Sequence, residues 1–238
     1  MNAFDSSFLE VLFRFVQRFP ALDVVLKYVV NDDFLKGGIL LAFIWWLWFS
    51  NDGTVHEKRE FLLFAFVSSS TALLLGRILA LYVPFRVRPL QNVLYNFPFP
   101  PTAPNAMPHS WNSFPSDHAI LFFSLAASLS MVSRGIGFLM ICHALIVICI
   151  PRIYMGYHYP SDIVGGALLG IGLAYVAQFT WLRKSVTRPV FLWIERHPSS
   201  FYAVGFLWTF EVAELFRTLL NLASFIRHSA EAFLRPHG

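Results

Sequence analysis

Residues 152–162 read Arg-Ile-Tyr-Met-Gly-Tyr-His-Tyr-Pro-Ser-Asp and place Arg152, His158 and Asp162 in a polar gap between two apolar runs. His158 and Asp162 are four positions apart, so one helical turn would bring the carboxylate against the imidazole. A carboxylate that holds one ring nitrogen leaves the other free to attack or to carry a proton. Arg152 adds a planar guanidinium whose N–H groups match phosphate oxygens. These residue types, at this spacing, indicate phosphoryl chemistry.

Two further segments carry side chains of the same kind. Residues 84–89 follow one apolar run and contain Arg86 and Arg88, and residues 113–118 precede another run and end in His118. Each segment lies at a predicted helix end, so the three segments can meet on one side of a helical bundle. There, Arg88 would bind phosphate through charge-assisted hydrogen bonds worth about 1.5–3 kcal/mol each. Arg86 is either a further phosphate ligand or an anchor for a lipid headgroup.

The expected mechanism divides the work between two histidines. Pro115 and Pro160 stand where proline favours a helix start, and the first N–H groups of such helices bind anions. His158 would attack phosphorus in line while Asp162 fixes its tautomer, and His118 would protonate the leaving oxygen. No Asp/Glu cluster suited to a metal ion accompanies these residues, so we expect neither a metal ion nor any other cofactor.

The order Arg-Pro, Pro-Ser-Asp-His and Arg-x5-His-x3-Asp resembles the motifs of the type 2 phosphatidic acid phosphatase superfamily over about residues 77–172. The resemblance implies a helical core of about six spanning segments that hydrolyses lipid phosphates, with His158 as nucleophile and His118 as acid. The phosphate ligands that it implies are Arg88, Ser116 and Arg152. Asp117 stands where Gly is commoner, which resembles bacterial undecaprenyl-pyrophosphate phosphatases, and we include Asp117 among the expected substrate-binding residues.

Two positions depart from the family pattern. The pattern has Lys or Arg seven residues before Arg88, and this chain has Leu81 there. Arg77 and Arg86 are the two candidates to replace that cation. The third motif normally has Ser before its arginine, whereas this chain has Pro151, so a hydroxyl ligand is absent. The reaction type is therefore better defined than the substrate.

The composition is that of a polytopic membrane protein. Hydrophobic residues make up 56% of the 238 residues and charged residues only 13%, against roughly 25% charged in soluble domains. The Lys and Arg residues lie between apolar segments and form no basic stripe interleaved with aromatics, which argues against nucleic-acid binding. The expected partners are a lipid phosphate substrate and membrane lipids, and the oligomeric state is left open.

Apolar runs predict the membrane-spanning helices of an all-α bundle. The runs cover about 34–50, 60–83, 118–133, 136–151 and 162–182. A last candidate at about 200–222 either spans the membrane or lies on its surface. Gly166 and Gly170, four residues apart in one run, predict close packing of two helices.

The N-terminal residues differ from these runs. Residues 4–30 have an amphipathic pattern broken near Pro20, which predicts helices that lie in the membrane interface or pack on the bundle. We therefore divide the chain into an N-terminal segment at 1–30, a single transmembrane domain at 31–225 and a C-terminal tail at 226–238.

The loop charges predict an orientation in a bacterial inner membrane. Lys58, Arg59, Arg134 and the four basic residues of the 183–197 loop mark the cytoplasmic side by the positive-inside rule. The 84–117 and 151–161 loops would then face outward, which places the active site on the extracytoplasmic side. The 84–117 loop, rich in Pro and aromatics, is either a stiff connector or a rim that guides a lipid headgroup.

The predicted function is hydrolysis of a polyprenyl (undecaprenyl) pyrophosphate, or a related lipid phosphate, through a phosphohistidine intermediate. A lipid phosphotransferase with the same site is one alternative, and a phosphatase acting on phosphatidic acid or phosphatidylglycerol phosphate is another. A non-enzymatic headgroup binder or transporter is the remaining alternative. His118, His158 and Asp162 together disfavour it, because binding alone needs no nucleophile with an orienting carboxylate.

Overall fold

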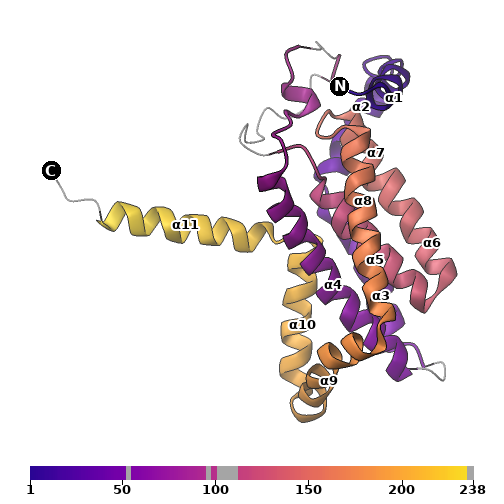
Figure 1. The fold of residues 1–238 in the computed structure, drawn as a ribbon, viewed down its shortest axis with the longest axis vertical. Helices are drawn as coiled ribbons and strands as arrows, with labels where there is room; N and C mark the ends of the chain where they lie inside the picture. The colour runs from indigo at the N-terminus through magenta and orange to yellow at the C-terminus, as the bar shows by residue number, and fades with distance from the viewer. Residues whose placement is uncertain (52–54, 95–97, 101–111, 235–238) are drawn as a thin grey trace.

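Figure 1 shows helices that run along one long axis, with the N-terminal helices at one end and the last helix extending sideways. This computed structural model covers residues 1–238, and the structure describes residues 1–51, 55–94, 98–100 and 112–234. Within those ranges every regular element is helical, so the predicted all-α class is confirmed there. The α-helices are α1 (Ala3–Phe13), α2 (Pro20–Asn31), α3 (Ile39–Phe49), α4 (Val55–Tyr82), α5 (Asp117–Val132), α6 (Arg134–His143), α7 (Ile150–Tyr154), α8 (Pro160–Tyr175), α9 (Thr180–Arg196), α10 (Pro198–Ala213) and α11 (Arg217–Leu234). The short 3₁₀ and π elements are η1 (Phe34–Gly38), η2 (Pro89–Gln91), η3 (Ala144–Cys149) and η4 (Val176–Gln178).

The central helix of the bundle is α5. Its residues 119–129 form an unbroken buried run, as expected for a helix that is apolar on all sides. Ser116 is its N-cap, with an extended backbone and a side-chain oxygen that accepts the Ala119 N–H. Contacts with α4, α6 and α8 surround the helix. The first turn of α5, which carries His118, is therefore fixed by its neighbours.

Glycines let α8 approach α5 closely, as the sequence predicts. Gly166 and Gly170 are both buried. A Cβ added at Gly166 would lie 2.7 Å from the Ser116 carbonyl oxygen, and one at Gly170 would collide with the backbone of Ile120. Only hydrogen fits at these two positions, so α5 and α8 pack almost backbone to backbone.

Among the described residues, two stretches are long and apolar enough to cross a membrane. They are Val55–Tyr82 and Arg134–Tyr154, with 28 and 21 residues, and the second joins α6, η3 and α7. The pair α8 and α9 would add a third span if it counts as one, although it bends by 80° near η4, inside the predicted run 162–182. Phe34–Phe49 and Asp117–Val132 are apolar but shorter. Length and composition thus support two or three spans, and about six remains a proposal.

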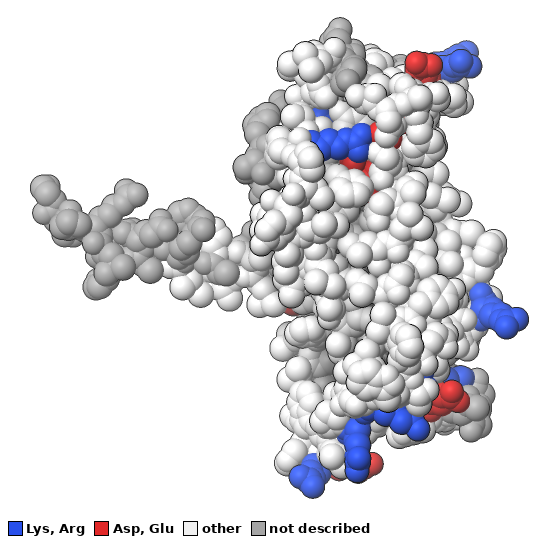
Figure 2. Space-filling view, in the orientation of Figure 1, with Lys and Arg blue, Asp and Glu red and all other residues white. Residues whose placement is uncertain are grey.

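The surface of the bundle suits contact with lipid. On the face in Figure 2, charged side chains gather mainly toward the two ends, and the broad band between the ends is largely uncharged. Leu74 of α4, Phe138 of α6 and Leu168 of α8 are 58%, 69% and 67% exposed. Exposed apolar side chains on several helices are expected of a protein whose middle is covered by lipid.

The predicted last segment at 200–222 is not one helix. The chain turns sharply between α10 and α11, where Leu215 and Phe216 have φ angles of 55° and 58°. The Glu211 carboxylate accepts the Leu219 N–H at 3.3 Å, so a side chain caps the start of the second helix. In Figure 1, α11 points away from the bundle, and it includes residues 226–234 of the predicted tail.

The N-terminal helices pack on the bundle rather than only lying beside it. The predicted break at Pro20 is confirmed, because α2 begins there. Both helices contact α7, and α1 also contacts α8. Leu9 is fully buried, whereas Phe4 and Phe8 stay exposed. For the 84–117 loop, residues 95–97 and 101–111 lie outside the described residues, and both interpretations of the loop stay open.

Candidate active site

The three predicted segments meet at one end of the bundle, where α4 ends and α5 and α8 begin (Figure 1). Backbone hydrogen bonds are among the contacts that join the segments. The N–H groups of Leu90, Ser113 and Ser116 donate to the carbonyls of Gly156, Arg86 and Asp162 at 2.9, 2.9 and 3.2 Å. The arrangement predicted from the order of the motifs is therefore present in the fold.

His158 lies in the buried turn between α7 and α8. Gly156 makes this turn with a φ of 74°, a conformation that L side chains rarely adopt. The His158 Nδ1 lies 2.9 Å from the Ser113 carbonyl oxygen, which can only accept a hydrogen bond. We therefore assign the proton to Nδ1, which leaves the Nε2 lone pair available for attack. Burial lowers the pKa of His158, partly opposed by Asp162, so the imidazole is neutral near neutral pH.

Asp162 lies beside His158, as predicted, but its closest partners are other groups. Its Oδ2 is 3.7 Å from the His158 Nδ1, a distance for electrostatic attraction rather than a hydrogen bond. The same oxygen accepts the Ser113 hydroxyl at 2.6 Å and the Tyr159 N–H at 2.8 Å. Ser113 thus links the two residues, because its carbonyl accepts from the imidazole and its hydroxyl donates to the carboxylate.

Arg88 and Arg152 bring two buried guanidinium groups to the two histidines. The Arg88 Nη1 lies 3.3 Å from the His158 Nε2, and the Arg152 Nη2 contacts the His118 Nε2. Only 7% of Arg88 and 4% of Arg152 is exposed. Within the described residues, neither guanidinium forms a salt bridge, and the Arg88 Nε and Arg152 Nη1 have no hydrogen-bond partner. Burial lowers the pKa of Arg88.

Such unpaired buried cations are costly unless an anion joins them. Arg88 contacts the His158 imidazole and Arg152 contacts the His118 imidazole, and the two pairs lie close enough to act electrostatically on each other. A phosphate group bound by both arginines would satisfy the open donors and neutralise their charge. The geometry therefore supports an anion site with a nucleophile on one side and a proton donor on the other.

Ser116 and Asp117 have partners within the protein. The fully buried Ser116 side chain caps α5 through a long 3.5 Å contact with the Ala119 N–H. Asp117 accepts the Arg77 Nε at 3.0 Å, and both side chains are about one-third exposed. Their predicted roles in substrate binding stay predictions. A phosphate would have to share Ser116 with its cap, and Asp117 would repel it unless Arg77 keeps the carboxylate neutralised.

Arg86 is held by groups of the protein itself, and its predicted role as phosphate ligand or headgroup anchor stays a prediction. Its guanidinium donates at 2.5 Å to both Asp5 and Asp162, and at 2.7 Å to the Ser161 hydroxyl. It also lies 3.9 Å above the Tyr159 ring. Two carboxylates already neutralise this cation, so a phosphate would have to compete with them for it.

The start of α8 is also occupied by the protein itself. The Ser161 N–H donates to Asp5 at 2.8 Å, and the Tyr159 N–H donates to Asp162. The Ser161 N–H is one of the groups after Pro160 that were expected to bind phosphate. Carboxylates take this position because the positive end of a helix dipole attracts any nearby anion.

Sequence reasoning missed three side chains of this region. Asp5 and Ser113 carry no motif of their own, and only the fold brings them to residues far along the chain. Lys36 is 97% buried, bonds to Asp33 at 2.7 Å and acts electrostatically on Arg152 and His118. The signal that could have revealed it is a lysine inside the apolar run 34–50. Leu81, in the place of the family's basic residue, is 81% exposed.

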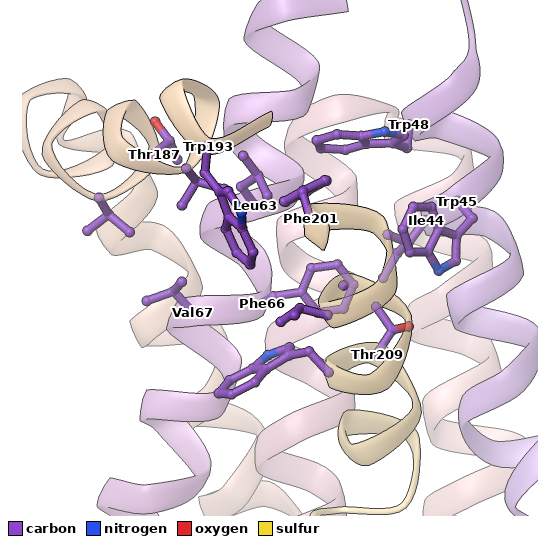
Figure 3. Close-up of a pocket in the computed structure, with 15 residues that line it drawn as sticks. Ile44, Trp45, Trp48, Leu63, Phe66, Val67, Thr187, Trp193, Phe201 and Thr209 are labelled. Carbon is purple, nitrogen blue, oxygen red and sulfur yellow. The ribbon is translucent and has the colours of Figure 1, made fainter. Parts of the chain in front are cut away.

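A separate cavity lies among α3, α4, α9 and α10. Figure 3 shows its aromatic and aliphatic lining, which includes Trp48, Phe66, Trp193 and Phe201. Its volume is about 220 Å³, and almost all of its lining is apolar. The α4 residues in the lining come from the first half of α4, whereas His118 and His158 lie near the C-terminal end of α4. The cavity is therefore distinct from the candidate active site.

Comparison with known proteins places these motifs in a family. The PAP2 superfamily profile matches residues 61–187, more than half of the chain. The bacitracin transport permease protein BcrC of Bacillus licheniformis is 34% identical over 119 residues, which cover 48% of this chain and 53% of that protein. The undecaprenyl-diphosphatase BcrC of Bacillus subtilis (strain 168) is 25% identical over 156 residues, covering 65% and 72% of the two chains. The match thus spans only about half the length of the first of these relatives.

A solved structure is also similar. It is the crystal structure of a transmembrane PAP2 type phosphatidylglycerolphosphate phosphatase from Bacillus subtilis. The similarity covers 75% of this chain and 85% of that one, with a TM-score of 0.49 and 22% identity.

Proposed function

This chain belongs to the PAP2 superfamily, and we propose that it is an integral-membrane phosphatase that hydrolyses a polyprenyl pyrophosphate. The observation that carries the proposal is the pair of buried guanidinium groups of Arg88 and Arg152, each of which contacts a histidine and keeps one donor without a partner. A site that only bound a headgroup would need the cations alone. The imidazoles of His118 and His158, which contact these arginines, would add an acid and a nucleophile.

In the first step, the His158 Nε2 forms a bond to the terminal phosphorus while the bond from phosphorus to the bridging oxygen breaks. The polyprenyl phosphate leaves with a proton that His118 gives to that oxygen. In the second step, water attacks the phosphohistidine, His118 takes the proton of the water, and the P–N bond breaks. The products are inorganic phosphate and the lipid monophosphate, and both histidines return to their starting state.

The arginines act mainly in the transition state. Arg88 and Arg152 are fixed by burial, so their donors need no reorganisation when charge develops on the phosphoryl oxygens. Arg152 contacts the His118 Nε2 in the free enzyme, which keeps a proton away from that nitrogen. A phosphate that enters between the two would take the donors of Arg152 and draw a proton to His118. Substrate binding would thus prepare the acid.

The choice of substrate rests on the relatives and the surroundings. The Bacillus subtilis relative is named an undecaprenyl-diphosphatase, and this chain has the long apolar helices of an integral membrane protein. A diphosphate offers a good leaving group and a terminal phosphate dianion for the two guanidinium groups. We propose the bacterial inner membrane as the location, with the site on the extracytoplasmic side.

A phosphate-release panel tests the proposal. Purified protein in proteoliposomes is given polyprenyl pyrophosphate, phosphatidic acid, phosphatidylglycerol phosphate or lipid A. We expect release to be fastest from the pyrophosphate and absent in His158→Ala. His197→Ala is the matched control, because that histidine is exposed near the start of α10, and it should keep wild-type turnover. Undiminished release by His158→Ala would exclude the mechanism.

A second candidate function is lipid transport, in which the arginines would bind the headgroup. One relative favours it, because it is named a transport permease. Label transfer separates the two functions. The terminal phosphate is labelled with ³²P, the reaction is quenched without acid, and label on the protein is measured. Label on histidine that is lost in His158→Ala supports the enzyme. Movement of lipid without labelled protein or released phosphate supports the transporter.

A further inference from the structure

Asp5 is a carboxylate from the N-terminal helix that the structure buries completely. Its neighbours on the same helix, Phe4 and Phe8, are exposed, so α1 lies at the surface with this one charge turned inward. A buried carboxylate is tolerated only when charged or hydrogen-bonding partners surround it. Asp5 also lies outside residues 61–187, the part of the chain that matches the family.

The partners of Asp5 belong to the candidate active site. Its Oδ1 accepts the Ser161 N–H at 2.8 Å, and its Oδ2 accepts the Ser161 hydroxyl at 2.8 Å and the Arg86 Nη2 at 2.5 Å. Ser161 is in the first turn of α8, so Asp5 occupies the positive end of that helix dipole. The same turn carries Asp162.

Arg86 connects Asp5 to the nucleophile. One side of its guanidinium bonds to Asp5, and the other bonds to the Asp162 Oδ1 at 2.5 Å. The second oxygen of Asp162 bonds to Ser113, whose carbonyl accepts from His158. A continuous hydrogen-bond chain therefore runs from α1 to the imidazole.

The charges along this chain explain why a second carboxylate is useful. With Asp162 alone, Arg86 would neutralise the carboxylate that faces His158. With Asp5 present, two carboxylates share one guanidinium, and the group keeps a net charge of about −1 when all three side chains are ionised. That charge is complementary to the imidazolium that forms when His158 attacks phosphorus.

We propose that Asp5 is a positioning residue of the reaction: it holds Arg86 so that Asp162 keeps its negative charge available to His158. The inference rests on the proposed function, because the reaction that Asp5 would assist is the proposed hydrolysis. It makes the N-terminal helix part of the catalytic unit. Asp5 touches no substrate, so it acts on turnover and not on substrate binding.

The test compares Asp5→Asn, which keeps the shape and removes the charge, with Glu10→Gln, which removes an exposed charge from the same helix. We expect Asp5→Asn to lower kcat about 10- to 100-fold, the usual range for a residue that orients a functional side chain, with KM changed less than about twofold. Asp5→Glu should recover part of the loss. Glu10→Gln should match the wild type. Wild-type kcat in folded Asp5→Asn overturns the inference.

A double-mutant cycle with Arg86→Gln tests the route of the effect. If Asp5 acts through Arg86, Asp5→Asn causes no further loss of kcat in the Arg86→Gln background. A further loss as large as that in the wild-type background overturns the inference. If Asp5→Asn alone does not fold, the double variant is compared with Arg86→Gln. In that background no guanidinium is left with a single carboxylate.

A substrate-free measurement separates this inference from the proposed function. The titration of His158 is followed by NMR of ¹⁵N-histidine-labelled protein, with His158→Ala to assign the signal. The charged groups facing His158 are Asp162 of α8, Arg88 after α4 and Arg152 of α7, and His118 of α5 is its titratable neighbour. Loss of the Asp5 charge should move the titration of His158 to lower pH.

The outcomes of the two measurements are distinct. No hydrolysis by the wild type, together with a shifted titration in Asp5→Asn, rejects the proposed function and retains the role of Asp5 in setting the charge at His158. Hydrolysis by the wild type with an unshifted titration and unchanged kcat in Asp5→Asn retains the function and rejects the role of Asp5.

Discussion

His158 and its cationic neighbours show how burial and charge set the state of one residue. Burial and the guanidinium groups of Arg88 and Arg152 lower its pKa, and Asp162 opposes them. The neutral form has the free lone pair that attack requires. The same cations that repel a proton attract phosphate, so one arrangement keeps the nucleophile ready and binds its target.

This arrangement predicts the pH dependence of the reaction. The ordinary pKa of His is about 6.5, and the pKa of His158 is lowered, so His158 stays neutral as the pH falls through about 6.5. The acid limb of kcat/KM should therefore lie below about pH 6.5. The measurement is a pH–rate profile with polyprenyl pyrophosphate, corrected for the separately measured ionisation of its terminal phosphate.

His118→Ala is the control for this profile. Its residual activity should keep the acid limb, which belongs to His158, and lose the alkaline limb, which belongs to the acid. An acid limb above about pH 6.5 in the wild type would contradict a lowered pKa of His158.

At the residue scale, motif order was enough to predict which side chains meet. Arg88, His118, Arg152 and His158 gather as the spacing indicated. The environment of Arg86 was not predictable, because its partners include Asp5, 81 positions away in the sequence. The link through Ser113 was also hidden, since a backbone carbonyl is present at every residue and carries no sequence signal.

Among the elements, the contact between α5 and α8 decides whether the two halves of the site meet. His118 lies in the first turn of α5, Asp162 lies in the first turn of α8, and His158 lies just before α8. Two glycines on α8 let the backbones approach. The sequence predicts this close packing, because two glycines four residues apart in an apolar run are typical of helices that pack closely.

Gly166→Ala should therefore affect both stability and turnover. Its Cβ would lie 2.7 Å from the Ser116 carbonyl oxygen and 2.9 Å from the Ala119 Cβ, so one helix must move. Such overpacking costs about 1–3 kcal/mol, and the displaced end of α5 carries His118. We expect a lower thermal unfolding temperature in detergent and slower phosphate release from polyprenyl pyrophosphate.

Gly172→Ala is the matched substitution on the same helix. Nothing lies within 4 Å of the added Cβ, so stability should be unchanged or slightly higher, since Ala favours helix over Gly. If Gly166→Ala unfolds and turns over like Gly172→Ala, the close approach of α5 and α8 does not limit the site.

Helix ends were harder to predict than helix existence. The apolar run 162–182 gave no sign of the bend near η4, and the run 200–222 gave no sign of the turn at Leu215 and Phe216. The residues on both sides of each break are apolar, so their hydropathy predicts one continuous membrane helix. The start of α11 depends on the Glu211 carboxylate, which accepts the Leu219 N–H, and a hydropathy pattern contains no such contact.

For the molecule as a whole, the distribution of charge gives an orientation that can be tested. In Figure 1, the starts of α4 and α6 and the whole of α9 lie away from the end where α5 and α8 begin. The basic residues of these elements are Lys58, Arg59, Arg134, Arg183, Lys184, Arg188 and Arg196. At the site end, Arg86 is paired with carboxylates and Arg88 and Arg152 are buried. These three therefore serve binding or structure, and a count of basic residues near the membrane surface should exclude them. Arg14, Arg18 and Lys27 of the N-terminal segment still count at the site end, so the prediction rests on the excess of basic residues at the other end.

We predict that the end with the basic residues is cytoplasmic and that the histidines face outward. Single cysteines are placed at Leu94, which is 85% exposed on the site side, and at exposed Lys184 in α9, after Cys142 and Cys149 are replaced by Ala. In intact bacterial cells expressing these variants, a membrane-impermeant maleimide should label Leu94→Cys and not Lys184→Cys. Both should react after the cells are broken, which controls for the reactivity of each thiol. Labelling of Lys184→Cys alone in intact cells would reverse the orientation, and the enzyme would then meet its lipid substrate on the cytoplasmic side.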